Sequence, residues 1–129
     1  MTPGDATANL DSADDVAAKF GMGEMGEARF LRTALGAARI GLADYRVKPG
    51  RRAGFGHRHR QAEEMYVVLA GSGRFKLDDE IVEVAARDVL YCPPSVMREW
   101  EAGPDGLHML AFGEHAEADN EGRRDFWTD

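Results

Sequence analysis

The stretch GHRHRQAEEMYVVLAG, residues 56–71, decides the fold. Successive side chains of a β-strand point to opposite faces, so His57 and His59 share a face and lie about 6.5 Å apart. The four residues before Glu64 allow a turn, which would return Glu64 on the adjacent strand. The apolar run after it is typical of a strand that stops at Gly71. Two imidazoles and a carboxylate arranged in this way can converge on one metal ion.

Outward from this stretch, short strands alternate with turn signals every eight to twelve residues, which indicates an all-β sandwich or barrel. Glycines at 71 and 73 are predicted to end one strand, and a type I turn over Gly103–Gly106 is predicted to join the last pair. The predicted strands cover residues 40–47, 65–69, 74–77, 80–84, 88–92, 98–101 and 107–112.

The two ends differ from the middle in composition. Residues 1–28 are polar and rich in alanine and glycine, and we expect an N-terminal arm with a short helix that ends at Gly21. Residues 29–113 would form the barrel, and residues 114–129 a polar tail. The tail carries Phe126 and Trp127, which we expect to pack across the domain or on a neighbouring subunit.

Composition excludes several classes of protein. The chain has 129 residues, a length that supports one domain. Its formal net charge of −7 argues against a nucleic-acid or anionic-membrane binder. No apolar run approaches the ~20 residues that a bilayer span needs, and no secretory signal is visible at the N-terminus. Cys92 has no partner for an intramolecular disulfide, which fits a reducing cytoplasm.

The motif at 57–71 resembles that of the cupin superfamily. In that family two histidines separated by one residue are followed by a glutamate and then a glycine, as His57, His59, Glu64 and Gly71 are here. The resemblance covers residues 37–113. It implies an all-β fold, a single jelly-roll barrel or double-stranded β-helix, usually dimeric, with the site inside the barrel mouth. The chain is similar to the small single-domain cupins of unassigned activity.

The second motif of the family departs from its usual form. Asp88 and two prolines after Cys92 are present, but Arg87 and Ser95 replace glycines. Arg98 stands where the family has its last histidine ligand. A guanidinium carries donors and no acceptor, so Arg98 cannot ligate a metal.

Two interpretations of the site follow from this departure. In one, His57, His59 and Glu64 hold a divalent metal (Fe, Mn, Ni or Zn), and Arg98 helps the metal to hold a small anionic substrate. In the other, Arg98 pairs with Glu64 and replaces the metal, and the pocket binds a small anion without it. The sequence leaves both open.

Other side chains are candidates for the same pocket. Tyr66 would face the way Glu64 does and is the leading proton donor, while Trp100 would share a face with Arg98 and contact substrate or fill the core. His108 could replace the missing ligand if it faced inward. Cys92 fits a buried thiol, and Glu63 is a less favoured substitute for Glu64.

The functional hypotheses are therefore a metal-dependent enzyme, as oxygenase, isomerase or lyase, and a metal-free binding or sensor module. A structural dimer with a vestigial pocket is the third alternative. The partners expected are a small anionic metabolite and, from the resemblance, a second copy of the chain in a homodimer. Acids gather in the arm, the tail and residues 78–83, whereas arginines surround the histidines, so an acidic protein can present a locally basic site.

Overall fold

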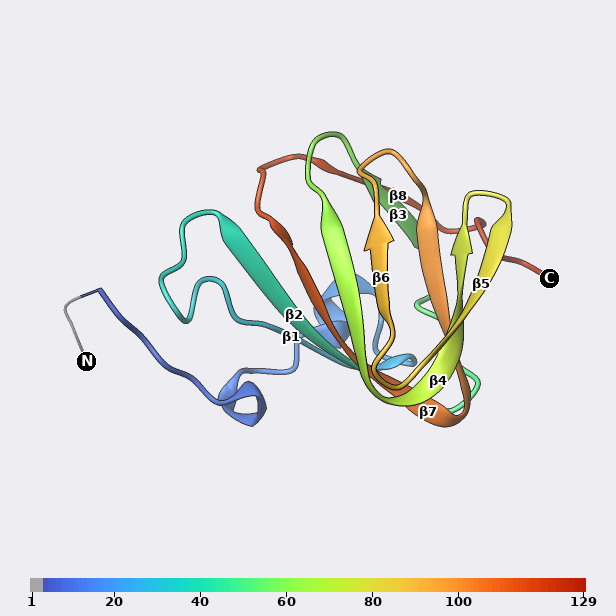
Figure 1. Cartoon of the computed structure of the whole chain (residues 1–129), viewed down its shortest axis with the longest axis horizontal. Helices are drawn as coiled ribbons and strands as arrows, with labels where there is room; N and C mark the ends of the chain where they lie inside the picture. Colours follow the sequence, from blue (N-terminus) through green and yellow to red (C-terminus); the bar gives the residue numbers. More distant parts are fainter. Residues whose placement is uncertain (1–3) are drawn as a thin grey trace.

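The structure is a computed structural model that describes residues 4–129, and it is built almost entirely from antiparallel strands (Figure 1). Its elements are the 3₁₀ turns η1 (Leu10–Ser12) and η2 (Ala17–Phe20), followed by β1 (Gly26–Phe30), β2 (Ile40–Val47), β3 (Gly56–His59), β4 (Glu64–Leu77), β5 (Glu80–Ala85), β6 (Val89–Cys92), β7 (Arg98–Glu114) and β8 (Asn120–Arg123). The all-β prediction is confirmed.

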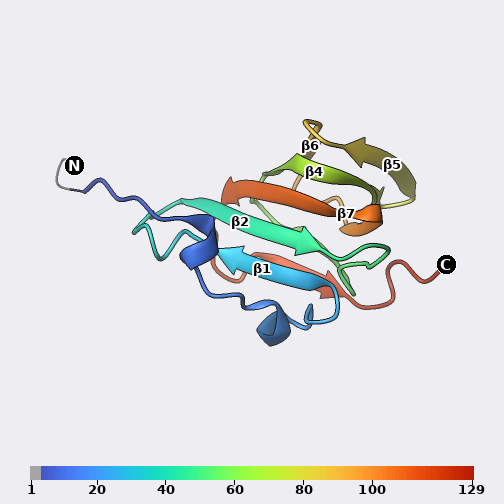
Figure 2. The same ribbon diagram turned by 90° about the horizontal axis from the view of Figure 1, so that it is seen from below.

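The two longest strands, β4 and β7, each contribute to both walls of the barrel. The first half of β4 pairs with β6 and the last half of β7, and β2 and β1 extend this wall. The second half of β4 pairs with β5 and the first half of β7, and β3 and β8 extend the opposite wall. Figure 2 shows β1, β2, β7 and β4 side by side in the first wall.

The predicted ends of strands at Gly71–Gly73 and at Gly103–Gly106 are wrong. β4 and β7 run on through these glycines, with register shifts in their pairing near Val68 and Gly73. The segments 98–101 and 107–112 are therefore parts of one strand and do not form a pair. At the bend Gly71 has a φ of +80°, and a Cβ there would overlap the carbonyl oxygen of Gly106. Glycine thus lets two bent strands pass closely where a turn was predicted.

The core lies between the walls and is centred on four aromatic rings. Trp100 is 4.7 Å from Tyr45 and 6.1 Å from Tyr66 between ring centroids, and Phe75 packs on both Tyr66 and Trp100. The indole Nε1 of Trp100 contacts the sulfur of Met25 at 3.2 Å. Because Met25 precedes β1, the N-terminal region covers part of the barrel interior.

The two ends of the chain are attached to the barrel. The expected short helix is the 3₁₀ turn η2, and Gly21 ends it in the left-handed conformation. At the other end, Phe126 and Trp127 form a small buried cluster with Met97. The tail therefore packs across its own domain, the first of the two expected arrangements. β8 lies inside the segment assigned to the tail and pairs with β3 over four residues.

Candidate metal site

The predicted site residues come together at the start of β4. His57 and His59 lie on β3 and Glu64 is the first residue of β4. The Nε2 atoms of the two histidines lie 3.4 and 3.3 Å from the same oxygen, Oε1 of Glu64. One ligand atom from each residue lies within 4.8 Å of the others. All three side chains keep some exposed surface, so solvent reaches the group.

The donor set fits a divalent transition metal. Two bonds of about 2.1 Å that meet at a tetrahedral angle separate their ligand atoms by about 3.4 Å, close to the distances from Glu64 Oε1 to the two imidazoles. Both ring nitrogens of His59 are buried and have no hydrogen-bond partner among the described residues. An unsatisfied buried nitrogen costs free energy, and a metal ion would remove that cost at Nε2.

The charge states of the group also suit a cation. Burial lowers the pKa of His57, although Glu64 opposes this, so the imidazole is neutral with a free lone pair at neutral pH. Burial would raise the pKa of Glu64, but contacts with His57 and His59 outweigh it and hold the pKa well below its usual range. The group therefore presents an anionic carboxylate at Glu64 and a neutral imidazole at His57.

Tyr66 faces the site and is hydrogen-bonded to Glu64, one of the three candidate ligands. Its hydroxyl donates a hydrogen bond of 2.8 Å to Oε1 of Glu64. The side chain is 1% exposed, and burial together with the Glu64 charge raises the pKa of the phenol well above its ordinary value. Tyr66 is accordingly protonated at neutral pH, and it orients the Glu64 carboxylate.

Arg98 lies behind the three residues and is fully buried. Its Nε donates to the sulfur of Cys92 at 2.9 Å, and its terminal nitrogens donate to the backbone carbonyls of His57, Cys92 and Pro93. Nε is 3.9 Å from Oε1 of Glu64, too far for a hydrogen bond. The guanidinium is thus held by hydrogen bonds to backbone carbonyls and to a thiol. It interacts with Glu64 electrostatically, without a hydrogen bond.

Trp100 and Cys92 are in the interior. Trp100 is 2% exposed and belongs to the aromatic core, with the ring of His57 at 6.3 Å. Cys92 has no exposed surface. Burial raises the pKa of its thiol even though Arg98 works in the opposite direction, so Cys92 is a protonated hydrogen-bond acceptor for Arg98.

Two other candidates lie outside the group. His108 is on the outer face of β7, where its Nε2 contacts Oδ1 of the buried Asp44 at 2.6 Å. Glu63 accepts a hydrogen bond from the hydroxyl of Tyr91 on the outer surface. Neither belongs to the cluster of ligand atoms around Glu64.

Sequence reasoning missed Asp119. This residue lies in the polar segment before β8, yet it is buried and its Oδ2 is 3.4 Å from Nδ1 of His59. Burial would raise its pKa, but hydrogen bonds from three backbone N–H groups, with His59 nearby, hold the pKa below its ordinary value. No local pattern singles out one acid among many in a polar tail.

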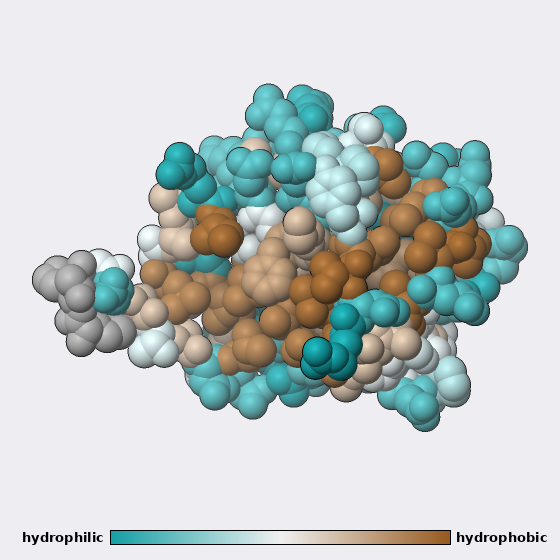
Figure 3. Space-filling model, in the orientation of Figure 1, coloured by the Kyte–Doolittle hydropathy of each residue, from teal (hydrophilic) through white to brown (hydrophobic). Residues whose placement is uncertain are grey.

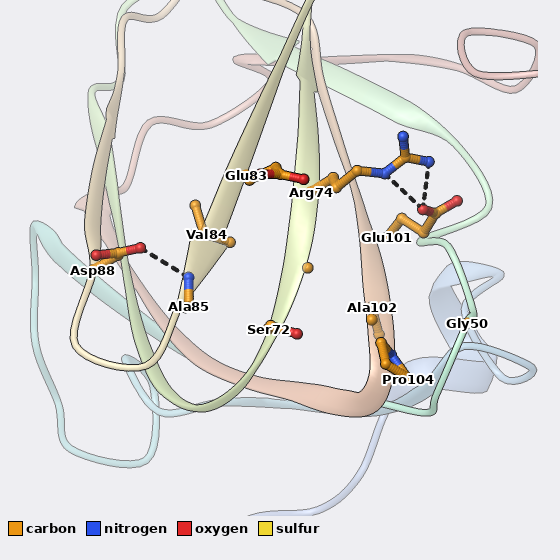
Figure 4. A pocket seen from close by; sticks show the side chains of 12 residues that line it. Gly50, Ser72, Arg74, Glu83, Val84, Ala85, Asp88, Glu101, Ala102 and Pro104 are labelled. Carbon is orange, nitrogen blue, oxygen red and sulfur yellow. Dashed lines mark hydrogen bonds and ion pairs between the residues drawn. The ribbon is translucent and has the colours of Figure 1, made fainter.

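A separate cleft of about 700 Å³ lies away from the histidines, between the β4–β5 pair and the bend of β7 (Figure 4). Three of its charged lining residues already have partners, since Arg74 binds Glu101 and Asp88 accepts from the backbone of Ala85. We therefore place the candidate site at the three ligands.

Comparison with known proteins agrees with this geometry. The sequence model of a family described as "Cupin domain" matches residues 43–111, more than half of the chain. The chain belongs to the cupin family. The jelly-roll prediction is thereby confirmed. The matched stretch contains β3, β4, β5 and β6 entirely, and most of β2 and β7.

Solved structures place this cupin among small single-domain proteins. A cupin protein from Bacteroides fragilis is 23% identical, with a TM-score of 0.71, and the alignment covers 100% of this chain and 99% of that one. A structure described as a sugar phosphate isomerase from Silicibacter pomeroyi is 15% identical with a TM-score of 0.72, covering 93% of each chain. At these identities the likeness concerns the fold alone.

A curated relative is similar over a shorter stretch. An uncharacterized protein of Methanocaldococcus jannaschii is 40% identical over 45 residues, which is 35% of this cupin and 36% of the relative. The match spans about a third of that protein's length. Across residues 4–129 of the cupin, no helix has the length and apolar character to cross a membrane.

Proposed function

We propose that this cupin binds one divalent metal ion through His57, His59 and Glu64 and uses it to hold a small anionic metabolite. The observation that carries the proposal is the pair of buried, unpartnered ring nitrogens of His59 beside the Glu64 carboxylate. Three protein ligands leave positions open for water or substrate. Fe, Mn, Ni and Zn are all compatible with this ligand type.

Charge supports an anion as the ligand. Glu64 and Arg98 offset each other formally, so a dication held between the two imidazoles leaves a positive site even after Asp119 is counted. A compact anion such as a carboxylate or phosphate is favoured in such a field. The Silicibacter pomeroyi protein is described as a sugar phosphate isomerase, and sugar phosphates belong to this chemical class.

We favour an enzyme, an oxygenase or isomerase, over a passive binding module. The bound cation would supply Lewis-acid polarisation of a ligand oxygen. Tyr66 is the candidate proton donor, because its phenol is protonated and lies at Glu64. Arg98 would contribute positive charge to substrate binding from its buried position, and Trp100 would form the apolar floor beside His57. The unpaired Cys92 fits a reducing cytoplasm.

The alternative is a metal-free anion-binding or sensor cupin in which Arg98 replaces the metal. Its supporting observation is the complete burial of the guanidinium near Glu64. Two observations weaken this alternative. Nε of Arg98 is 3.9 Å from Oε1 of Glu64, and the guanidinium N–H groups donate to Cys92 and to backbone carbonyls instead. Arg98 therefore forms no close ion pair that would neutralise Glu64.

A homodimer is part of the proposal. Side chains on the outward face of β2, β7, β4 and β6 are apolar and partly or well exposed: Leu42, Met65, Val67, Leu69, Val89, Tyr91, Leu110 and Phe112. Figure 3 shows apolar surface across the middle of the molecule with polar side chains around it. A contiguous apolar face of this kind is typical of protein interfaces, and we assign it to a second copy.

Metal titration tests the proposal. The purified chain is stripped with a chelator and titrated separately with Zn²⁺, Mn²⁺, Ni²⁺ and, without oxygen, Fe²⁺. We expect one ion per chain for at least one metal and a loss of affinity of at least about 100-fold in His57→Ala and His59→Ala. His115→Ala is the matched control, since this exposed histidine lies outside the group.

The result that would overturn the metal site is a wild-type protein that binds none of the four ions. Metal binding that persists unchanged in His59→Ala would also overturn the metal site. A second titration, of inorganic phosphate into the stripped and the loaded protein, separates the alternatives. Tighter phosphate binding by the loaded form supports the metal-held anion, and equal binding supports the metal-free module.

A further inference from the structure

Asp119 fixes the turn that joins the two histidines to the glutamate. Its Oδ1 accepts hydrogen bonds from the backbone N–H groups of Arg60 and Gln61, at 3.0 and 2.9 Å, and its Oδ2 accepts from that of Ala62 at 3.0 Å. The carboxylate comes from a segment that is about 60 residues away in sequence. A distant part of the chain therefore sets the conformation between His59 and Glu64.

The same carboxylate faces the outer nitrogen of His59. Oδ2 of Asp119 is 3.4 Å from Nδ1, and Oε1 of Glu64 is 3.3 Å from Nε2 on the other side of the ring. The imidazole thus stands between two carboxylates. Both nitrogens are buried, and the described residues give neither a well-formed hydrogen bond.

Competition for Glu64 decides which nitrogen carries the proton. Oε1 of Glu64 already accepts from the hydroxyl of Tyr66 and lies 3.4 Å from Nε2 of His57. An N–H at Nε2 of His59 would compete with the Tyr66 hydroxyl for this same oxygen. Oδ2 of Asp119 lies 3.4 Å from Nδ1 and accepts one hydrogen bond, from the backbone N–H of Ala62, so the proton is better placed on Nδ1.

We propose that Asp119 is a positioning residue that holds His59 in the Nδ1–H tautomer and directs the Nε2 lone pair toward Glu64. This inference rests on the proposed metal site for its purpose. A carboxylate behind a ligating imidazole fixes ring orientation and raises ligand basicity. β8 and Asp119, the residue before it, would then position a metal ligand in addition to completing the sheet beside β3.

The tautomer of His59 in the metal-free protein is the first test. Ring ¹⁵N chemical shifts of the wild type are measured at a pH where the imidazole is neutral, with His59→Ala used to assign the signals. We expect Nδ1 to carry the proton. In Asp119→Asn, we expect the population to move toward Nε2–H. A wild-type ring protonated on Nε2, or a tautomer unchanged by Asp119→Asn, would overturn the inference.

Metal affinity is the second test, and Glu121→Gln is the matched control. Glu121 is on β8 two residues from Asp119, but it is exposed and pairs with Arg58 outside the barrel. We expect Asp119→Asn to weaken the best-bound ion about 10- to 100-fold and Glu121→Gln to leave it within about 2-fold. Equal weakening in both variants would count against Asp119 as a positioning residue.

These outcomes separate the inference from the proposed function. A wild type that binds no metal but keeps His59 as Nδ1–H supports the inference and refutes the metal site. A wild type that binds metal with Nε2 protonated in the stripped form does the opposite. If Asp119→Asn does not fold, the wild-type tautomer alone decides.

Discussion

Glu99 is a carboxylate on β7 that solvent hardly reaches, with 2% of its surface exposed. Its Oε2 accepts from the backbone N–H of Gly54 at 3.2 Å, whereas its Oε1 is buried and has no partner among the described residues. Burial raises the pKa of Glu99 despite the hydrogen bond from Gly54. The folded protein therefore retains a proton that the unfolded chain would already have released.

Stability should consequently fall as pH rises through the ordinary carboxylate range toward the raised pKa of Glu99. Glu99→Gln removes the buried charge and keeps an acceptor for Gly54. We expect it to raise the free energy of unfolding at neutral pH by about 1 kcal/mol relative to wild type. Urea denaturation at a series of pH values measures this. The gain should vanish in acid, and a gain independent of pH would refute the explanation.

The residues of the metal group were predictable because their relation is local. The spacing of His57 and His59 follows from strand alternation, and Glu64 returns after one short turn. Arg98 was placed at the site by the resemblance of residues 87–98 to the second motif of the family. The partners of its guanidinium were not predictable, because they are a thiol and backbone carbonyls whose positions depend on how β3 and β6 pack.

Among the elements, β3 is the strand on which the site depends most. It pairs with β7 at His57 only and with β8 at four positions. On its outer side the ring of Phe126 lies where a side chain at position 56 would be, since a Cβ on Gly56 would come within 2.5 Å of that ring. The tail therefore covers β3 closely, and Gly56 is needed for the approach.

Gly56→Ala should displace Phe126 and cost about 1 to 3 kcal/mol in the free energy of unfolding. Gly122→Ala is the control, because Gly122 is paired with His57 in the same ladder and a Cβ there would have only ordinary contacts. Chemical denaturation of both variants and of Phe126→Ala measures the effect. We expect Gly56→Ala to cost less in the Phe126→Ala background, because the two nearest ring atoms are then absent and only the Cβ of residue 126, at 2.8 Å, remains close. Fully additive losses would contradict the proposed contact.

Element ends were less predictable than element positions. Glycines at 71 and 73 carry the usual signal for a turn, but in β4 they permit a bend while the strand continues. Whether a glycine reverses or bends a strand depends on what it meets, here the carbonyl oxygen of Gly106 on β7. β8 and Asp119 were missed for the same reason, because only long-range pairing with β3 and its turn defines them.

At the scale of the whole molecule, the apolar outer face is the feature that most affects behaviour in solution. Met65 lies in it between Phe112 on β7 and Tyr91 on β6, and 49% of its surface is exposed. Because the neighbouring strands on both sides contribute apolar side chains, a charge introduced at Met65 would be buried in any dimer formed through this face.

Met65→Glu should therefore convert the proposed dimer to a monomer with little loss of monomer stability. Light scattering coupled to gel filtration gives the mass, and thermal unfolding checks the fold. Ile81→Glu, on β5, is the control, since this residue is similarly exposed and lies outside the apolar face. A wild type that is monomeric at high concentration, or a Met65→Glu variant that stays dimeric, would refute the assignment of this face.

The pairing of β3 with β8 also bears on when the proposed metal site can form during synthesis. While the chain is being synthesised, β3 emerges long before residues 119–127, which secure it from outside. Contacts between segments this distant in sequence form late in folding. The two histidines should therefore remain in an unfixed strand until residues 119–127 have been synthesised. A nascent chain that ends before Asp119 would lack the contacts that hold the proposed metal site together.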